Sequence, residues 1–364
     1  MNESVDNASV RKILVFKFGG VGDYAILLPF LEDLKNLYPD ASITAVSSPS
    51  GRQLLEHGGF VDKTIISTAL YKQGMESVLS LEAFRDLFRI RREMEAPYDM
   101  FIDVVSKYSF GGILKPLVLK LLSRPKYSIG LDAGGKAFYL DERIPDNRYE
   151  KKHNIEKYGE ILKKLGAKPV FHTALIKPSH CALNKANDFF LPFEGYPRIG
   201  LHPGANAKYF DSRAWPVERF AELAEKIKTM NPSARIFATS GPHEDELVKR
   251  LESLARSELI PVPLTENIID FCAFLSKFDF YISSDTGPMH LAVAMGIPTI
   301  GIFGHADYES YGTYPPELHF SAMTLEKGRK YGPSPSIKDP RGLLEISADD
   351  VFSKYLELKN RCGK

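Results

Sequence analysis

The stretch Phe280-Tyr-Ile-Ser-Ser-Asp-Thr-Gly-Pro-Met-His-Leu-Ala-Val-Ala-Met-Gly-Ile-Pro-Thr-Ile-Gly-Ile-Phe-Gly304 gives the clearest fold signal in the chain. Its first apolar run predicts a strand, and Asp285 and Thr286 then form a turn. Pro288 suits the first turn of a helix, where its missing N–H is not needed. Gly296 ends that helix before a second apolar strand begins. A strand, a helix and a strand in this order predict an α/β fold with parallel strands.

The start of this helix is also a candidate ligand site. A helix that begins just past the carboxyl end of a parallel strand presents backbone N–H groups and the positive end of its dipole, and both favour a phosphate. Asp285, Thr286, Gly287 and His290 all lie there, which is more polar than packing requires. An ordinary crossover with a well-capped helix is the alternative, since capping residues alone do not exclude it.

The composition limits the classes of protein to which the chain can belong. Its 364 residues suffice for two domains, and a hydrophobic content of 44% supports sizeable cores. Lysine and arginine total 47 against 46 for aspartate and glutamate, and the resulting net charge of +1 argues against a nucleic-acid-binding protein. Cys181, Cys272 and Cys362 are scattered, so we expect no disulfide framework and no zinc site, as fits a reducing cytoplasm.

We expect no targeting segment and no membrane-spanning segment. The first ten residues are polar and lack the apolar core of a signal peptide. No run of about 18 uninterrupted apolar residues occurs, which is the length a transmembrane helix needs.

A glycine-rich turn joins the first predicted strand, residues 12–18, to the first predicted helix. Its glycines, Gly19, Gly20 and Gly22, do not follow the G-x-G-x-x-G spacing of a dinucleotide site. The second predicted strand ends in Ser47-Ser-Pro49, without the acidic residue that binds a ribose. These two departures disfavour a dinucleotide-dependent oxidoreductase, and the absence of G-K-[ST] disfavours a P-loop.

Asp23 lies in the first turn of that helix, and its position supports two interpretations equally. A carboxylate there commonly caps the helix. It can also act as a general base, and the glycines before it would let a substrate approach the backbone closely.

Three motifs in this order resemble glycosyltransferase family 9, the heptosyltransferases of lipopolysaccharide synthesis. The first is Phe18-Gly-Gly-Val-Gly-Asp-Tyr-Ala-Ile-Leu-Leu-Pro29. The second is His202-Pro-Gly-Ala205, followed by Arg213-Ala-Trp-Pro216. The third is Asp285-Thr-Gly-Pro-Met-His290, with a later Gly-x-Pro and a strand that ends in Phe-Gly. Three ordered motifs over roughly the whole chain are a specific signal.

The sequence departs from the family pattern in four places. Gly19 and Gly20 stand where many members have Ser-Ser, and Arg213-Ala replaces a common Lys-Arg before Trp-Pro. His305-Ala-Asp-Tyr308 replaces a common Pro-Thr-Asp-Pro, and the cysteine cluster of many members is absent. These departures leave the reaction class intact but leave the donor sugar and the acceptor open.

The resemblance implies a role for each matching residue. Asp23 matches the catalytic base, and the acceptor-side loop before it holds Gly19, Gly20 and Gly22. The implied donor-binding residues are Arg213, Lys208, Glu244, Asp285, Thr286, Gly287 and His290. Among them Arg213 matches the basic residue that contacts donor phosphate, and Lys208 is placed to share that role. Glu244 matches the residue that meets the ribose, although the acidic run Glu244-Asp-Glu246 leaves this register open.

The resemblance also implies the GT-B fold, an α/β architecture of two Rossmann-like, doubly wound domains that face a central cleft. We expect an N-terminal acceptor domain over residues 1–175 and a C-terminal nucleotide-sugar donor domain over residues 176–345. The proline-punctuated residues 168–197 are the expected connection. Residues 346–364 are expected to form a helix that crosses back to the N-terminal domain.

The implied function is inverting, metal-independent transfer of a heptose or related sugar from a nucleotide diphosphate sugar, ADP-heptose in most of the family. The acceptor would be a lipopolysaccharide core or related glycan that is lipid-linked at the inner membrane surface. No cofactor is expected, and no D-x-D motif indicates a metal. The enzyme would be cytoplasmic, either throughout or as a peripheral protein at the inner face of the inner membrane. Two alternatives stay open: a non-catalytic nucleotide-sugar or glycan binding protein on the same fold, and a transferase with a different donor sugar.

Membrane contact is the alternative interpretation of one apolar segment. Residues 110–122 form a strongly apolar predicted helix that is flanked by Lys115, Lys120 and Arg124. Burial in a core, with the basic side chains extended to solvent, is the favoured interpretation. Contact with the membrane that carries the acceptor is the alternative.

Overall fold

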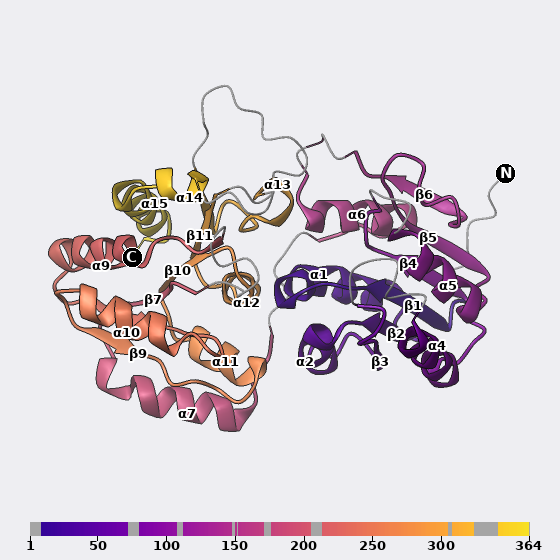
Figure 1. Ribbon diagram of the computed structural model, residues 1–364, viewed down its shortest axis with the longest axis horizontal. Coiled ribbons are helices and arrows are strands. Elements are labelled where there is room, and N and C mark those ends of the chain that lie inside the picture. Colours follow the sequence, from indigo (N-terminus) through magenta and orange to yellow (C-terminus); the bar gives the residue numbers. More distant parts are fainter. Residues whose placement is uncertain are drawn as a thin grey trace. The chain divides into compact units, whose positions relative to one another are not determined.

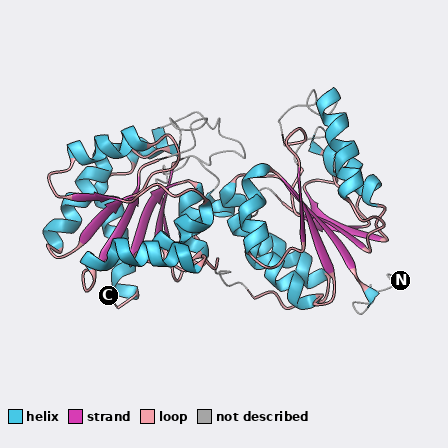
Figure 2. Ribbon diagram, turned by 90° about the horizontal axis from the view of Figure 1, so that it is seen from below, coloured by secondary structure: helices cyan, strands magenta, loops and turns pink. Residues whose placement is uncertain are grey.

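The computed structural model describes residues 9–71, 80–107, 112–147, 150, 152–170, 176–204, 213–304, 308–323 and 341–363. The chain divides into two compact units, Met1–His172 and Thr173–Lys364. In each unit the described residues form a six-stranded parallel sheet with helices on both of its faces (Figure 1 and Figure 2). The predicted α/β class with two doubly wound sheets is therefore confirmed.

The first unit has its strands in the spatial order β3-β2-β1-β4-β5-β6. The strands are β1 (Lys12–Lys17), β2 (Ser42–Ser47), β3 (Lys63–Ile66), β4 (Met100–Asp103), β5 (Tyr127–Asp132) and β6 (Glu142–Pro145). The helices are α1 (Val21–Leu37), α2 (Arg52–His57), α4 (Leu81–Glu93), α5 (Leu114–Ser123) and α6 (Asn154–Lys164). Strand β1 is an almost unbroken apolar run because helices cover both faces of the sheet, and five of its residues are buried.

The second unit has its strands in the spatial order β12-β11-β10-β7-β8-β9. The strands are β7 (Arg198–His202), β8 (Arg235–Ala238), β9 (Leu259–Pro261), β10 (Phe280–Ser284), β11 (Thr299–Phe303) and β12 (Phe320–Met323). The longer helices are α7 (His180–Phe190), α9 (Val217–Met230), α10 (Asp245–Leu254), α11 (Ile268–Leu275), α12 (Gly287–Ala294) and α15 (Ala348–Arg361). Two short helices, α13 (Tyr308–Tyr311) and α14 (Arg341–Glu345), follow β11 and precede α15.

Both sheets reverse their strand order at the same point. In the first unit the chain moves outward from β1 to β2 and β3, and then continues on the other side of β1 with β4, β5 and β6. In the second unit β7 takes the place of β1, and β10 takes the place of β4. Open parallel sheets bind ligands at the carboxyl ends of the strands beside such a switch point. Ligands are therefore expected at the loops that follow β1 and β4, and at those that follow β7 and β10.

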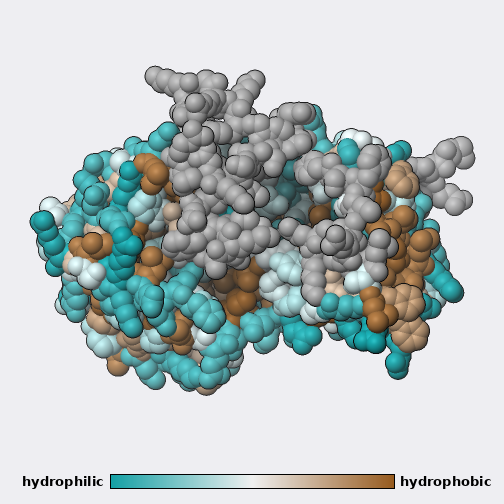
Figure 3. All heavy atoms as spheres, in the orientation of Figure 1, coloured by the Kyte–Doolittle hydropathy of each residue, from teal (hydrophilic) through white to brown (hydrophobic). Residues whose placement is uncertain are grey.

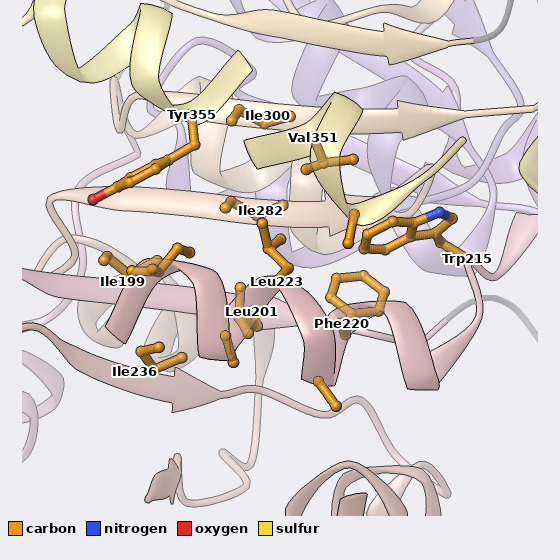
Figure 4. Packing of buried hydrophobic residues seen from close by; sticks show 14 of the residues in the cluster. Ile199, Leu201, Trp215, Phe220, Leu223, Ile236, Ile282, Ile300, Val351 and Tyr355 are labelled. Carbon is orange, nitrogen blue, oxygen red and sulfur yellow. The ribbon is translucent and has the colours of Figure 1, made fainter. Parts of the chain in front are cut away.

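The core of the second unit joins its sheet to helices α9 and α15. Figure 4 shows Ile199, Leu201 and Ile282 of the sheet packed with Leu223 of α9 and Val351 of α15. All five side chains are buried. This packing makes the sheet a rigid support for the loops at its carboxyl edge.

The C-terminal helix α15 packs on the second unit, so the predicted crossing back to the N-terminal domain was wrong. Val351 and Tyr355 are buried in the second core, and the Tyr355 ring meets the Phe280 ring edge to face, with centroids 5.3 Å apart. Lys226 of α9 also forms an ion pair with Asp349 at 2.7 Å. The apolar stripe of α15 is thus covered by the sheet and α9 of its own unit.

Candidate active site

The turn after β1 places Asp23 beside a buried lysine. Asp23 is the third residue of α1 and follows Gly22, and its Oδ2 accepts a hydrogen bond from the Gly20 N–H at 2.9 Å. Its Oδ1 lies 3.0 Å from Nζ of Lys17, the last residue of β1. The Lys17 side chain is 7% exposed and the Asp23 side chain is 25% exposed. Asp23 therefore caps the helix and also presents a partly accessible carboxylate, so the two interpretations of its position are compatible.

Gly19 allows this turn to close tightly. A Cβ on Gly19 would lie 2.5 Å from Cβ and Cγ of Asp23, so a side chain there would displace the carboxylate. The Gly19 carbonyl accepts hydrogen bonds from the hydroxyls of Ser48 and Ser50, at 2.7 and 2.8 Å. The turn is thus fixed to the loop that follows β2, which sets the position of Asp23.

Lys17 and Tyr158 belong to this site, although sequence reasoning missed both. Lys17 Nζ donates a hydrogen bond to the Tyr158 hydroxyl at 3.1 Å, and Tyr158 of α6 is buried. Burial raises the pKa of Tyr158, against the opposing effect of the Lys17 charge, so the hydroxyl is neutral. A lysine at the end of an apolar strand was a usable signal for Lys17. Tyr158 had no such signal, because it lies on a helix 141 residues further along the chain.

The turn after β10 brings two polar side chains, Arg213 and His290, to a second carboxylate, that of Asp285. Oδ2 of Asp285 lies 3.4 Å from Nη1 of Arg213, and its Oδ1 lies 3.8 Å from Nε2 of His290. The side chains of Asp285 and His290 are each 7% exposed, whereas that of Arg213 is 34% exposed. Asp285 therefore holds a partly exposed guanidinium at the carboxyl end of β10.

The helix that begins at this turn has no side-chain cap. Thr286 is the N-cap of α12, but its side chain makes no capping hydrogen bond, and its hydroxyl lies 3.1 Å from that of Ser283. Gly287 and Pro288 are the first two helical residues. The backbone N–H groups of this first turn and the positive end of the helix dipole therefore lack a side-chain acceptor from Thr286, and such groups favour an anion.

Trp215 holds Arg213 in this position. Its backbone N–H donates to Oγ of Ser284 at 3.0 Å, and its indole N–H donates to a backbone carbonyl just before α15 at 2.9 Å. The buried ring packs edge to face on Phe220, with centroids 4.8 Å apart (Figure 4). Ser284 directly precedes Asp285, so the bond to Ser284 places Arg213 beside Asp285. The single tryptophan of the chain is therefore a structural anchor of the site.

The acidic run at the start of α10 has a definite register. Oε2 of Glu244 accepts a hydrogen bond from the Gly241 N–H at 2.5 Å and lies 3.7 Å from Nε2 of His202. Asp245 and Glu246 are exposed, whereas the Glu244 side chain is only 18% exposed. Glu244 is thus the acid of this run that turns toward the carboxyl end of β7.

The loop after β7 leaves room for this carboxylate. A Cβ on Gly204 would lie 2.3 Å from a carboxylate oxygen of Glu244. His202, the last residue of β7, is buried, and its Nδ1 lies 3.1 Å from the hydroxyl of Thr239. Burial lowers the pKa of His202, against the opposing effects of Glu244 and a hydrogen bond to the Thr239 backbone. His202 belongs to the second sequence motif but was not among the predicted site residues.

The predicted residues fall into two groups, one in each unit. Four of them follow β1: Gly19, Gly20, Gly22 and Asp23. Six of them lie in the second unit. Asp285, Thr286, Gly287 and His290 follow β10, Arg213 pairs with Asp285, and Glu244 lies beside the end of β7. Lys208 lies outside the described residues. In the described part of the chain, no three His, Cys, Asp or Glu side chains are grouped as metal ligands. None of the described helices combines the length and the apolar character that a bilayer crossing needs.

The chain is similar in sequence and in structure to known heptosyltransferases and family 9 glycosyltransferases. The chain is 24% identical over 307 residues to lipopolysaccharide heptosyltransferase 1 of Escherichia coli K12, which covers 83% of this chain and 91% of that protein. A family 9 glycosyltransferase from Veillonella parvula superposes with a TM-score of 0.74 at 20% identity, over 96% of this chain and 97% of the other. E. coli heptosyltransferase WaaC, solved with ADP-2-deoxy-2-fluoro heptose, superposes with a TM-score of 0.67 at 19% identity, over 95% and 99% of the two chains.

These likenesses identify the architecture as the GT-B fold, as predicted. The family model of glycosyltransferase family 9 (heptosyltransferase) matches residues 88–333, which is more than half of the 364 residues. The chain therefore belongs to glycosyltransferase family 9, the heptosyltransferase family, and is a glycosyltransferase.

Proposed function

We propose that this protein is an inverting, metal-independent heptosyltransferase that moves a heptose from ADP-heptose to a lipopolysaccharide core acceptor. The observation that carries the proposal is the uncapped start of α12, where Asp285 holds Arg213 at 3.4 Å. A helix N-terminus and a guanidinium together match the charge and geometry of a diphosphate. The acceptor would be lipid-linked, and the enzyme would meet it from the cytoplasm at the inner membrane surface.

The second unit would bind the donor through three groups of contacts. The N–H groups at Thr286 and Gly287 and the guanidinium of Arg213 would hold the diphosphate, with Lys208 as a second cation. His290 would donate a further hydrogen bond to a phosphate oxygen. Glu244 would accept hydrogen bonds from the ribose hydroxyls, as its inward position beside β7 allows. The ADP-heptose analogue in the related WaaC structure supports ADP as the nucleotide.

The first unit would supply the base. Asp23 would take the proton of an acceptor hydroxyl while that oxygen forms a bond to the anomeric carbon of the heptose. The bond from this carbon to the diphosphate breaks on the opposite side, so the configuration inverts and ADP leaves with the electron pair. Arg213 and the start of α12 would stabilise the charge that develops on ADP. Lys17 would keep the Asp23 carboxylate in place through its 3.0 Å ion pair.

Two other functions are compatible with the same residues. A transferase of this fold with a different nucleotide sugar would keep the catalytic base and the anion site. It would differ in its contacts to the nucleobase and to the sugar of the donor. A binding protein would keep the anion site without turnover. The partly exposed Asp23 favours a catalytic function over a binding protein, because donor binding in the second unit would not need a carboxylate in the first unit.

The proposal is tested by calorimetric titration of ADP, GDP, UDP and NADH in EDTA. The proteins are the wild type, Asp285→Asn in the second unit and Asp23→Asn in the first unit as its matched control. We expect ADP to bind most tightly and to do so in EDTA. We expect Asp285→Asn, which loosens Arg213, to weaken ADP binding roughly tenfold, because a hydrogen bond to a charged group contributes about 1.5–3 kcal/mol. Asp23→Asn should bind ADP as the wild type does.

Each other result contradicts part of the proposal. Tighter binding of UDP or GDP would replace the donor. Dependence on a divalent cation would refute metal independence. Binding of none of the four ligands, or of NADH alone, would refute the donor site. Binding of ADP-heptose without transfer to a lipopolysaccharide core fragment would favour the binding protein.

A further inference from the structure

Helix α4 has an outward face that its own fold does not use. Leu81, Phe84 and Phe88 are 66%, 68% and 63% exposed, and their spacing places them on one side of the helix. Among the described helices, α4 alone carries three such exposed large hydrophobic side chains. Burial of three large apolar groups is normally favourable, so a face of this kind marks a place where another surface binds.

Three arginines share this outward face. At 3.6 residues per turn, Arg85, Arg91 and Arg92 fall in the same sector of the helix as Phe84 and Phe88. Arg85 and Arg92 are exposed, and Arg91 is half-buried. Among the acidic residues of α4, Asp86 is buried, Glu93 pairs with Arg89, and the exposed Glu82 lies beyond the border of this sector. The sector itself is therefore apolar and basic.

Arg89 shows what a structural arginine on this helix looks like. Its guanidinium pairs with Asp86 at 2.5 Å and with Glu93 at 2.7 Å, and it donates to the backbone carbonyl of Ile66. Arg85, Arg91 and Arg92 form no ion pair with any other residue that the structure describes. The fold thus accounts for one of the four arginines of α4 and leaves the other three for a partner.

The opposite side of α4 is firmly held. Ala83, Ile90 and Met94 are buried in the first unit's core, and Ser80 caps the helix with a 3.0 Å hydrogen bond. Helix α5 adds to the same core, and its Leu121 is 67% exposed. Figure 3 shows hydrophobic surface over the part of the first unit where Figure 1 labels α4 and α5. The apolar and basic face is therefore a fixed surface feature.

We propose that this face of α4 docks on a lipid bilayer that contains anionic phospholipid. Phenylalanine and leucine side chains insert at the boundary between headgroups and acyl chains, and arginines bind the lipid phosphates there. The absence of acidic residues from the face is what an anionic surface requires. The choice of a bilayer rests on the proposed function in one respect, namely that the acceptor is lipid-linked. Residues 110–122, which the sequence offered for membrane contact, overlap α5, and Leu121 of this helix is also exposed.

The test is co-sedimentation of the full chain with vesicles of phosphatidylethanolamine and phosphatidylglycerol, against vesicles of phosphatidylcholine alone, at low and high salt. One variant, Phe84→Ser with Phe88→Ser, removes the apolar part. Another, Arg85→Gln with Arg92→Gln, removes two charges. The matched controls lie in the second unit: Leu191→Ser with Leu264→Ser, which are 62% and 51% exposed, and Lys185→Gln with Arg256→Gln.

The wild type and both controls should bind the anionic vesicles and lose binding at high salt. The arginine variant should bind roughly 10–30-fold more weakly, since each basic residue near an anionic surface contributes about fivefold. The phenylalanine variant should lose at least about tenfold, because two buried apolar side chains are removed. Far-ultraviolet circular dichroism, thermal unfolding and ADP binding of these variants should match the wild type.

Three results would overturn the proposal. They are no binding of the wild type to anionic vesicles, equal binding by the α4 variants, and a concentration-dependent dimer in light scattering that the phenylalanine variant abolishes. The last result would assign the face to a second copy of the chain. Vesicle binding uses neither donor nor acceptor, so it can hold when transfer of heptose fails, and transfer to a water-soluble core fragment can hold when vesicle binding fails.

Discussion

Helices α1 and α12 stand beside the switch points of their sheets, α1 after β1 in the first unit and α12 after β10 in the second. Their N-termini differ in charge. At α1 the N-cap N–H is taken by the Asp23 carboxylate, which a buried Lys17 balances at 3.0 Å. At α12 no side chain caps the first turn, and Asp285 is turned to Arg213 and His290.

This difference separates two kinds of chemistry on one topology. A helix start that already holds its own carboxylate has little attraction for a ligand anion but offers a proton acceptor. A helix start with no side-chain cap and a neighbouring guanidinium attracts an anion. In the proposed function, the topology sets where ligands bind, and a few side chains decide whether a helix start serves as the catalytic base or as the anion site.

The largest expected effect comes from Asp23→Asn, which tests the first of these two helix starts. The amide oxygen can still accept the Gly20 N–H, so α1 stays capped, but the side chain no longer takes a proton. We expect the rate of transfer to fall about 10²–10⁴-fold, as for loss of a general base, with ADP affinity unchanged. Steady-state kinetics and calorimetry measure the two quantities. A rate within a few fold of the wild type would make Asp23 a helix cap only.

A smaller effect is expected from Arg213→Gln, which tests the second helix start. Loss of the guanidinium should weaken ADP binding roughly 10–100-fold, because a charge-assisted contact to phosphate contributes about 1.5–3 kcal/mol. Calorimetric titration measures the affinity. Arg250→Gln is the matched control, since Arg250 pairs with Glu218 on the surface of the same unit. If both variants bound ADP equally well, α12 would have to hold the diphosphate without Arg213.

A buried histidine of the second unit should make the stability of the protein sensitive to acid. His319 in the second unit is buried, its Nδ1 accepts the Thr299 N–H, and burial lowers its pKa to about 4. Between pH 6.5 and about 4 the unfolded chain binds a proton that the folded chain does not, so the free energy of unfolding falls as the pH falls. From pH 7 to pH 5 this loss should be about 2 kcal/mol, at about 1.4 kcal/mol per pH unit below the ordinary histidine pKa.

The variant His319→Asn separates this histidine from all other acid effects. Asparagine can still accept the Thr299 N–H but does not titrate. Chemical denaturation at pH 7 and at pH 5 should give a smaller difference for the variant than for the wild type, even if its stability at pH 7 is lower. An unchanged difference would show that other groups determine the response to acid.

The smallest effect is expected from Glu244→Gln, which tests the neighbouring loop at β7 and β8. The amide should be a weaker acceptor for the ribose hydroxyls, so ADP affinity should fall by roughly tenfold or less. Asp245→Asn is the control, because this adjacent acid is exposed. Titration of adenosine, in competition with ADP, locates the loss. Adenosine has the ribose hydroxyls but no diphosphate, so an equal loss of affinity for both ligands would place the effect at the ribose. Equal losses in the two variants would mean that the inward position of Glu244 is not what matters.

Much of the fold could be predicted because its signals are local. Apolar runs, glycines and capping residues marked the strand–turn–helix units around Asp23 and Asp285 at their observed places. Helix α6 likewise begins at a local signal, with His153 as its N-cap. Such features depend on the periodicity of the backbone and on groups a few residues apart, which the sequence shows directly.

The partners of these features could not be predicted. Trp215 bonds to Ser284, 69 residues away, and Lys17 bonds to Tyr158, 141 residues away. The C-terminal helix packs on α9, where the sequence led us to expect a crossing to the other domain. Each of these contacts depends on strand order and on which face a helix covers.

The sequence by itself therefore determined the class of the fold, the family and the positions of the candidate base and anion site. Only the tertiary structure decided that Glu244 is the inward acid, that Lys17 accompanies Asp23, and that α12 lacks a side-chain cap. The physical reason is that a local pattern specifies the direction of a backbone segment. The burial and charge environment of a side chain come from segments that the chain brings together only when the sheets form.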